Sequence, residues 1–172
     1  MQKIGLFYAS STGNTENVAN AIKETMTSSQ IELHNVDSCD DDAMNEYEFI
    51  ILGVSTWGEG DLQDDWDDYL PNMQKVDFTN KTIALFGLGD QEEYCDNFLD
   101  AMGALYDVAI EAGATVVGSW STDGYEHDES TAIRNGEFVG LAIDEDNQEE
   151  LSNERVTKWV EQISPYFTKE VT

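Results

Sequence analysis

The chain has 172 residues, 40% of them hydrophobic and 10% aromatic, so we expect residues 1–172 to fold as one domain with a sizeable core. Eight Lys and Arg residues stand against 36 Asp and Glu residues, which gives a formal net charge of −28. The electrostatic field of this negative charge repels nucleic acid and anionic membrane surfaces, and it favours partners with a basic docking face. Solubility or adaptation to salt is the alternative explanation of the excess charge.

Targeting and metal-binding signals are absent from the sequence. No basic N-terminal segment precedes a long apolar run, and no apolar stretch reaches the length of a membrane span, so we expect neither secretion nor membrane insertion. Cys39 and Cys95 form no CxxC or other metal-binding spacing, and we interpret them as reduced thiols of a cytoplasmic monomer. His34 and His127 are isolated, and we expect no metal site.

The first predicted strand, Ile4–Tyr8, leads into the polar run Ser10–Thr15 and then into a helical pattern. Backbone amides and hydroxyls of such a turn converge at a helix N-terminus, whose dipole favours an anion, so the run predicts a phosphate site. The run contains no Lys or Arg, whereas a nucleoside triphosphatase loop carries Gly-Lys-Ser/Thr for the phosphoryl group that it transfers. Neutral donors suit a phosphate that is held and not transferred.

Two further strands are predicted at Ile31–Val36 and Phe49–Val54. The second leads into the loop Ser55–Gly60, in which Trp57 precedes Gly58. We place Trp57 on this loop, outside any strand or helix periodicity, where the ring has no core face to join.

The fourth predicted strand, Thr82–Gly87, leads into a loop that runs to Tyr94. Tyr94 resembles Trp57 in lying outside the regular periodicity, on a loop with glycines. A helix is expected to begin near Asp96 and to end at Gly113.

The fifth predicted strand begins at Thr115–Gly118. The polar segment 119–137 then interrupts the alternation before the apolar run Phe138–Ile143, and we interpret this segment as an insertion that splits the fifth strand. The last helix is expected to follow Ser152 as its N-cap and to close at Ser164-Pro165.

The alternation of strands and helices predicts an α/β fold, a doubly wound parallel sheet with right-handed crossovers. Loops after the first, third and fourth strands then meet at one end of the sheet, where ligands bind. Trp57 and Tyr94 there are able to clamp a flat aromatic ligand beside the phosphate, which together describe a mononucleotide. The alternative is that the two rings cover the sheet end or belong to a protein interface.

These motifs together resemble those of flavodoxins, over essentially the whole chain. The motifs that carry the resemblance are Ser10–Thr15 with Glu16 and Asn17, Thr56–Gly58, Gly87–Gln91 and Phe138–Gln148. Flavodoxins are a standard example of a five-stranded parallel sheet in the order 2-1-3-4-5 with FMN at the switch point between strands one and three. The insertion is similar to that of the long-chain group.

The resemblance implies FMN as the cofactor and assigns it a set of residues. Ser10–Thr15 are implied to bind its phosphate, Trp57 and Tyr94 to stack on the isoalloxazine ring, and Asp146 to contact the ribityl chain. The whole implied FMN-binding set is Ser10, Ser11, Thr12, Gly13, Asn14, Thr15, Ser55, Thr56, Trp57, Gly58, Glu59, Gly60, Leu88, Gly89, Asp90, Tyr94, Asn97, Phe98 and Asp146. Ser55 stands where the family often has Pro.

The implied function is a one-electron carrier of low potential that replaces ferredoxin and performs no catalysis of its own. The acidic residues that crowd the Trp57 loop disfavour a negatively charged reduced flavin, which agrees with a low potential. The Gly58–Glu59 peptide is expected to rotate at low cost and to hydrogen-bond to the flavin after one-electron uptake. Implied partners are a ferredoxin–NADP reductase, a pyruvate oxidoreductase, a photosystem or a nitrogenase.

Three alternatives share parts of this pattern. An FMN-dependent NAD(P)H:quinone reductase is the most serious, although the chain has no GxGxxG fingerprint and no basic residue near the loops. A receiver domain requires acidic residues where Ser10-Ser11 and Ser55-Thr56 stand. A small phosphatase requires a Cys in the anion loop.

Overall fold

The computed structural model describes residues 2–9, 13–40, 42–57 and 60–167. The strands are β1 (Gln2–Tyr8), β2 (Ser29–Asn35), β3 (Phe49–Trp57), β4 (Asp61–Leu62), β5 (Thr82–Leu88), β6 (Thr115–Val117), β7 (Ile133–Arg134), β8 (Glu137–Phe138) and β9 (Leu141–Ile143). The α-helices are α1 (Asn14–Thr25), α2 (Asp64–Met73), α3 (Asp100–Glu111) and α4 (Ser152–Ile163). None of the described helices is long and apolar enough to cross a membrane.

The central sheet is parallel and runs in the order β2-β1-β3-β5-β6. Its register places Ile4 opposite both Ile31 of β2 and Phe49 of β3. Counted by its five main strands, this order is the predicted 2-1-3-4-5, so the flavodoxin-like fold class is confirmed. The short β4 pairs antiparallel with the end of β3, an addition that the sequence analysis did not foresee.

The fifth strand is divided as predicted. β6 pairs with the first half of β5, where Thr82 lies opposite Thr115, and β9 pairs with the second half, where Leu88 lies opposite Ile143. The intervening insertion contains the hairpin β7–β8 and a bridge between Trp120 and Phe138. The two halves thus act as one strand, and the insertion leaves the sheet between them.

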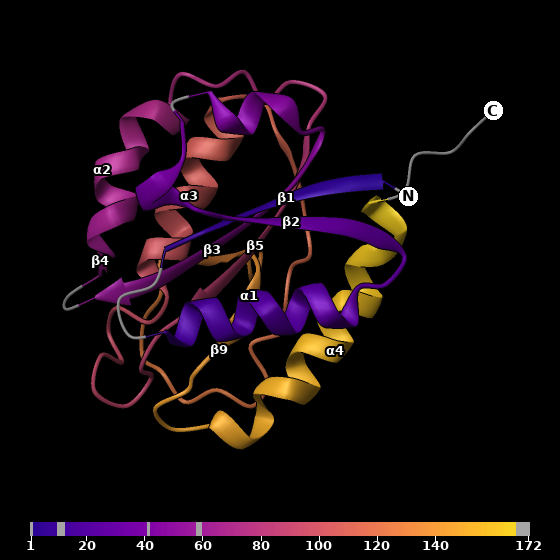
Figure 1. Ribbon diagram of the computed structural model, residues 1–172. Helices are drawn as coiled ribbons and strands as arrows, with labels where there is room; N and C mark the ends of the chain where they lie inside the picture. Colours follow the sequence, from indigo (N-terminus) through magenta and orange to yellow (C-terminus); the bar gives the residue numbers. More distant parts are fainter. Residues whose placement is uncertain (1, 10–12, 41, 58–59, 168–172) are drawn as a thin grey trace.

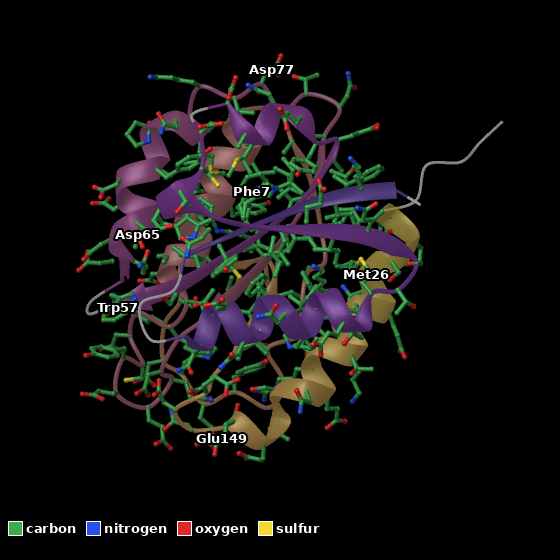
Figure 2. All side chains as sticks on the ribbon, in the orientation of Figure 1. Phe7, Met26, Trp57, Asp65, Asp77 and Glu149 are labelled. Atoms are coloured by element: carbon green, nitrogen blue, oxygen red, sulfur yellow. The ribbon has the colours of Figure 1, made fainter. Side chains whose placement is uncertain are left out.

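Helices cover both faces of the sheet, with α2 and α3 on one side and α1 and α4 on the other (Figure 1). Alternate residues of each strand enter separate cores. Phe7 and Ile50 pack on the α2–α3 side, whereas Leu6 and Ile51 pack on the α1–α4 side with Met26 (Figure 2). Burial on both faces explains why the strands are nearly continuous apolar runs.

The helix α2 is capped at its N-terminus by Gln63 and anchored to β3 by Trp66. The side chain of Gln63 accepts hydrogen bonds from the amides of Asp65 and Trp66, at 2.9 and 3.3 Å, and caps the helix N-terminus. The indole Nε1 of the fully buried Trp66 donates to the carbonyl of Gly53 at 2.7 Å. The ring of Trp66 thus anchors α2 to the sheet, at the end of the helix that carries the acidic first turn.

Two predicted helix starts are wrong. The helix expected near Asp96 begins at Asp100, because the preceding segment is held in turns by the insertion; for example, Phe98 N donates to the carbonyl of Glu129 at 3.3 Å. The last helix begins at Ser152 itself, after the short 3₁₀ helix Glu149–Leu151, and the buried Ser152 hydroxyl caps no amide.

Candidate functional site

A cleft of about 290 Å³ lies at the carboxyl ends of the central strands. This edge of the sheet faces left in Figure 1, where β3 ends beside the start of α1. The lining residues are Asn14, Thr15, Ser55, Thr56, Trp57, Leu88, Gly89, Asp90, Glu93, Tyr94, Glu145 and Asp146. The cleft therefore joins the three loops that the sequence analysis predicted to meet, together with the turn after β9.

The amino end of α1 opens into this cleft through Asn14 and Thr15. Gly13 precedes the helix with φ +91°, the left-handed region that glycine adopts without strain, and its carbonyl accepts from Asn17 N at 3.0 Å. A helix N-terminus carries unpaired amides and a partial positive charge. The predicted residues Ser10, Ser11 and Thr12 lie outside the described residues, as do Gly58 and Glu59.

Trp57 is the last residue of β3, where it pairs with Asp61 of β4. The expectation that it lies on an irregular loop is therefore wrong, because the short β4 extends the strand pairing through this residue. Trp57 is 42% exposed and stands at the end of the strand (Figure 2). The indole Nε1 donates to the Ser55 hydroxyl at 2.8 Å, and this contact orients the ring.

The end of β3 is braced against α3 by side chains. The Thr56 hydroxyl oxygen accepts from the Ala101 amide at 3.1 Å, near the start of α3. Gly60 has φ +98°, and a Cβ at this position would lie 2.8 Å from the Asp100 carboxylate. Asp100 in turn accepts from the Asn97 side chain at 3.0 Å. Glycine is therefore the residue that lets this turn approach α3.

Tyr94 faces the cleft from the turn that follows β5. The residue is 39% exposed, and its amide donates to the Asp90 carbonyl at 3.0 Å. The Asp90 carboxylate accepts from the amides of Glu92 and Glu93, at 3.1 and 2.9 Å, and closes the turn. Tyr94 and Trp57 are thus two large aromatic side chains that stay half-exposed in one cleft. Exposure of apolar surface to water is unfavourable, and a ligand that covers the two rings would remove it.

The charges that line the cleft are all negative: Asp90, Glu93, Glu145 and Asp146. Burial by itself raises the pKa of Asp90, but hydrogen bonds from neighbouring amides and from Asn147 outweigh burial, and the pKa lies below its ordinary value. The pKa of Asp146 is raised, by burial first and then by the charges of the surrounding acids. Such a cleft opposes the accumulation of further negative charge.

Four of the predicted residues that the structure describes are absent from this lining, namely Gly13, Gly60, Asn97 and Phe98, and two residues that were not predicted are present in it. Phe98 is 1% exposed and packs against His127 and Phe138, and Asn97 contacts Asp100 behind the Gly60 turn. Glu93 and Glu145, which sequence reasoning did not select, line the cleft. Their positions directly beside Tyr94 and Asp146 are the only sequence signal for them.

The histidines and cysteines lie away from the cleft lining. His34 Nε2 lies 2.7 Å from the Tyr47 hydroxyl, and His127, within the insertion, packs against the rings of Phe98 and Phe138. Cys95 has Asp96 and Asp128 close enough to share an ion, but this cluster lies at the surface, where acidic groups commonly gather without one.

The chain matches the family model of flavodoxins over residues 6–159. It is similar to the flavodoxin of Picosynechococcus sp., with 50% identity over 97% of this chain and 99% of that protein. It is also similar to flavodoxin 1 of Escherichia coli K12, with 45% identity over 93% and 92% of the two chains. Among solved structures, the Fusobacterium nucleatum flavodoxin bound to flavin mononucleotide superimposes with a TM-score of 0.93 at 34% identity, covering 98% of this chain and all 100% of that one.

Proposed function

Because this chain belongs to the flavodoxin family, we propose that it binds FMN non-covalently in the cleft and carries single electrons between redox proteins. The observation that carries the proposal is the pairing of two half-exposed rings, Trp57 and Tyr94, with the amino end of a helix in one cleft. A mononucleotide offers both a planar ring system and a phosphate, which are the two groups that these features accept.

The phosphate end of FMN fits the start of α1. Asn14 and Thr15 supply polar groups at the helix N-terminus, and the dipole of α1 favours a doubly charged phosphate there. None of the described residues that line the cleft is Lys or Arg. Binding without a cation holds the phosphate in place and offers no group that would assist its transfer.

The ring end of FMN fits the space between Trp57 and Tyr94. When bound, FMN supplies the redox chemistry through its isoalloxazine ring. Trp57 and Tyr94 then orient the ring and exclude water from its faces, while Ser55 fixes the indole. Four cleft carboxylates disfavour negative charge on the ring, which supports a low reduction potential.

We further propose that the protein stands in for ferredoxin-type carriers and docks through its acidic surface onto redox proteins with a basic face. The support is the formal charge of −28, together with the three acidic residues Asp64, Asp65 and Asp67 in the first turn of α2, beside the end of β3. Charge complementarity of this kind accelerates encounter and selects partners. A ferredoxin–NADP reductase, pyruvate oxidoreductase, photosystem or nitrogenase fits that description.

An absorption spectrum of the purified protein tests the proposal. The protein as purified is expected to show the absorption bands of a flavin. If it is purified without FMN, its addition to an FMN solution is expected to quench the flavin fluorescence, with an end point of one FMN per chain. A colourless protein that takes up no FMN would contradict the proposal. Single-electron transfer to a ferredoxin–NADP reductase, with no oxidation of NADPH by a quinone in its absence, separates a carrier from an FMN-dependent quinone reductase.

A further inference from the structure

Asp144 is the one buried acidic side chain among the described residues, with 0% exposure. It directly follows β9 and immediately precedes Glu145 and Asp146, which line the cleft. Burial of a carboxylate is costly unless hydrogen bonds replace its water shell. The position of this one buried acid, directly behind the cleft, therefore requires an explanation.

Five N–H groups converge on the Asp144 carboxylate. Oδ1 accepts from the amides of Asp146 and Asn147, at 3.1 and 3.0 Å. Oδ2 accepts from the amide and the side chain of Gln91, at 3.2 and 2.7 Å, and from the Asn147 side chain at 2.9 Å. All five partners are donors, which is the arrangement that a carboxylate accepts in full.

These hydrogen bonds join two segments that are far apart in the sequence. Gln91 belongs to the turn after β5 that carries Asp90 and Tyr94, whereas Asn147 belongs to the turn after β9. Asn147 strengthens the link, because its side chain also donates to Asp90 at 2.8 Å. Asp144 therefore holds together the two turns that supply the acidic wall of the cleft.

Gln91 is 2% exposed and uses both ends of its amide. Its nitrogen donates to Asp144, and its oxygen accepts from the amide of Glu126 in the insertion. The direction of the Gln91–Asp144 hydrogen bond is thus fixed by a third group. A reversed pair, with the donor at position 144 and the acceptor at position 91, preserves the Glu126 contact.

We propose that Asp144 is a positioning residue for FMN binding, acting through Gln91 and Asn147, and that it fixes the spacing of the Asp90–Tyr94 turn from the Glu145–Asp146 turn. This inference rests on the proposed function. It deepens that function by assigning the geometry of the cleft to a carboxylate that is absent from the cleft lining.

A reversal experiment tests the positioning role. In Asp144→Asn, the new side-chain N–H group faces the side-chain N–H group of Gln91, and in Gln91→Glu the two carboxylates at positions 91 and 144 face each other. Each single variant is therefore expected to raise the FMN dissociation constant about tenfold. The double variant restores one hydrogen bond across the two turns and keeps the net charge at −28. Its dissociation constant is expected to rise by less than the product of the two single rises, because one hydrogen bond is restored while the amide of Gln91 and the side chain of Asn147 still lose their acceptor at position 144.

Two exposed positions provide controls of matched chemistry. Asp123→Asn and Gln74→Glu make the same two exchanges on the surface, and neither is expected to change FMN affinity by more than about twofold. Single variants that bind as tightly as the unmodified protein, or a double variant whose loss is the sum of the single losses, would overturn the proposal. Thermal unfolding of each variant separates weaker binding from loss of the fold.

Amide hydrogen exchange tests the same contact in the protein as purified. The Gln91 amide loses its acceptor in Asp144→Asn and is expected to exchange at least about tenfold faster, while amides of the buried strand β1 keep their rates. An unchanged Gln91 rate would count against Asp144 as the link. If the unmodified protein takes up no FMN, the proposed function fails, and this measurement still decides whether Asp144 joins the turns.

Discussion

The indole nitrogen of Trp57 donates to the hydroxyl of Ser55, which lies two residues earlier on the same face of β3. This contact selects one orientation for a ring that has little packing around it, since 42% of Trp57 is exposed. Ser55 therefore organises the cleft without having to touch a ligand.

Replacement of Ser55 by Ala is expected to weaken FMN binding about fivefold, the equivalent of one hydrogen bond of roughly 1 kcal/mol. The reason is that the indole loses its fixed orientation before the ligand arrives. Titration of flavin fluorescence measures the change, and Trp57 fluorescence anisotropy reports the ring motion. Ser121→Ala removes a hydroxyl that accepts from Asp123 N in the insertion, and it serves as the control. Equal affinity in Ser55→Ala and the unmodified protein would exclude this role.

Trp57→Leu and Tyr94→Leu are each expected to weaken FMN binding by about 10- to 100-fold. Each variant loses ring stacking and part of the apolar surface that FMN covers, together about 1.5–3 kcal/mol. Tyr166→Leu removes a similarly exposed ring, 57% accessible, outside the cleft lining and is expected to bind normally. If both cleft variants bind as tightly as Tyr166→Leu, the rings do not hold the cofactor.

The two cleft carboxylates Asp146 and Asp90 give opposite dependences of stability on pH. Asp146 has a raised pKa, so the folded state gains stability as pH falls through that value towards 3.8, its ordinary value. Asp90 has a lowered pKa, so its stabilising contribution is present above 3.8 and is lost as pH falls through the folded value.

Asp146→Asn is accordingly expected to raise the unfolding temperature of the FMN-free protein at about pH 7, and Asp90→Asn to lower it. The difference for Asp146→Asn should shrink as pH falls towards 3.8, and the difference for Asp90→Asn should shrink only as pH falls below 3.8. Thermal unfolding over this range of pH measures both differences. Shifts of the same sign in the two variants would be inconsistent with the opposed pKa directions.

Gly13 and Gly60 form a matched pair for backbone strain. Both have positive φ, +91° and +98°, but a Cβ at Gly13 meets nothing within 4 Å, whereas one at Gly60 meets Asp100 at 2.8 Å. Gly13→Ala is expected to cost about 1 kcal/mol of unfolding free energy, and Gly60→Ala about 2–3 kcal/mol. Urea unfolding measures both, and a larger cost at Gly13 would contradict the contact-based argument.

Salt is expected to slow electron transfer to a partner with a basic face, by about tenfold between about 10 and 200 mM, because exposed charges are screened. Asp65 on α2 points outward in Figure 2, and Asp65→Lys should reduce both the rate at low salt and its salt dependence. Asp77→Lys places the same charge before the amino end of β5, away from the cleft, as the control. A rate independent of salt would assign the −28 charge to solubility.

Much of the fold was predictable because its signals are local. Buried parallel strands require continuous apolar runs such as Phe49–Val54, and the helix after β1 shows the expected apolar stripe. The insertion was also visible, since the polar segment 119–137 interrupts two apolar half-strands that β5 then accepts in sequence. The three loops meet because parallel strands end at the same edge.

Boundaries that depend on distant partners were not predictable. The start of α3 moved to Asp100 because the insertion binds the preceding turns, and β3 extends to Trp57 because β4 folds back onto it. Phe98 was assigned to the site by resemblance, yet its ring is covered by His127 and Phe138 from the insertion. No local pattern encodes these contacts.

The sequence by itself determined the class of fold, the end of the sheet at which the cleft lies and the half-exposed pair Trp57 and Tyr94, because periodicity, turn residues and misplaced aromatics are read along the chain. Only the tertiary structure decided which of the described acidic residues is buried. Asp144 appears in the sequence as one acid of the run Asp144–Asp146. It becomes the centre of five hydrogen bonds because β9 sets its carboxylate beside Gln91, more than fifty residues away, where amide groups replace water.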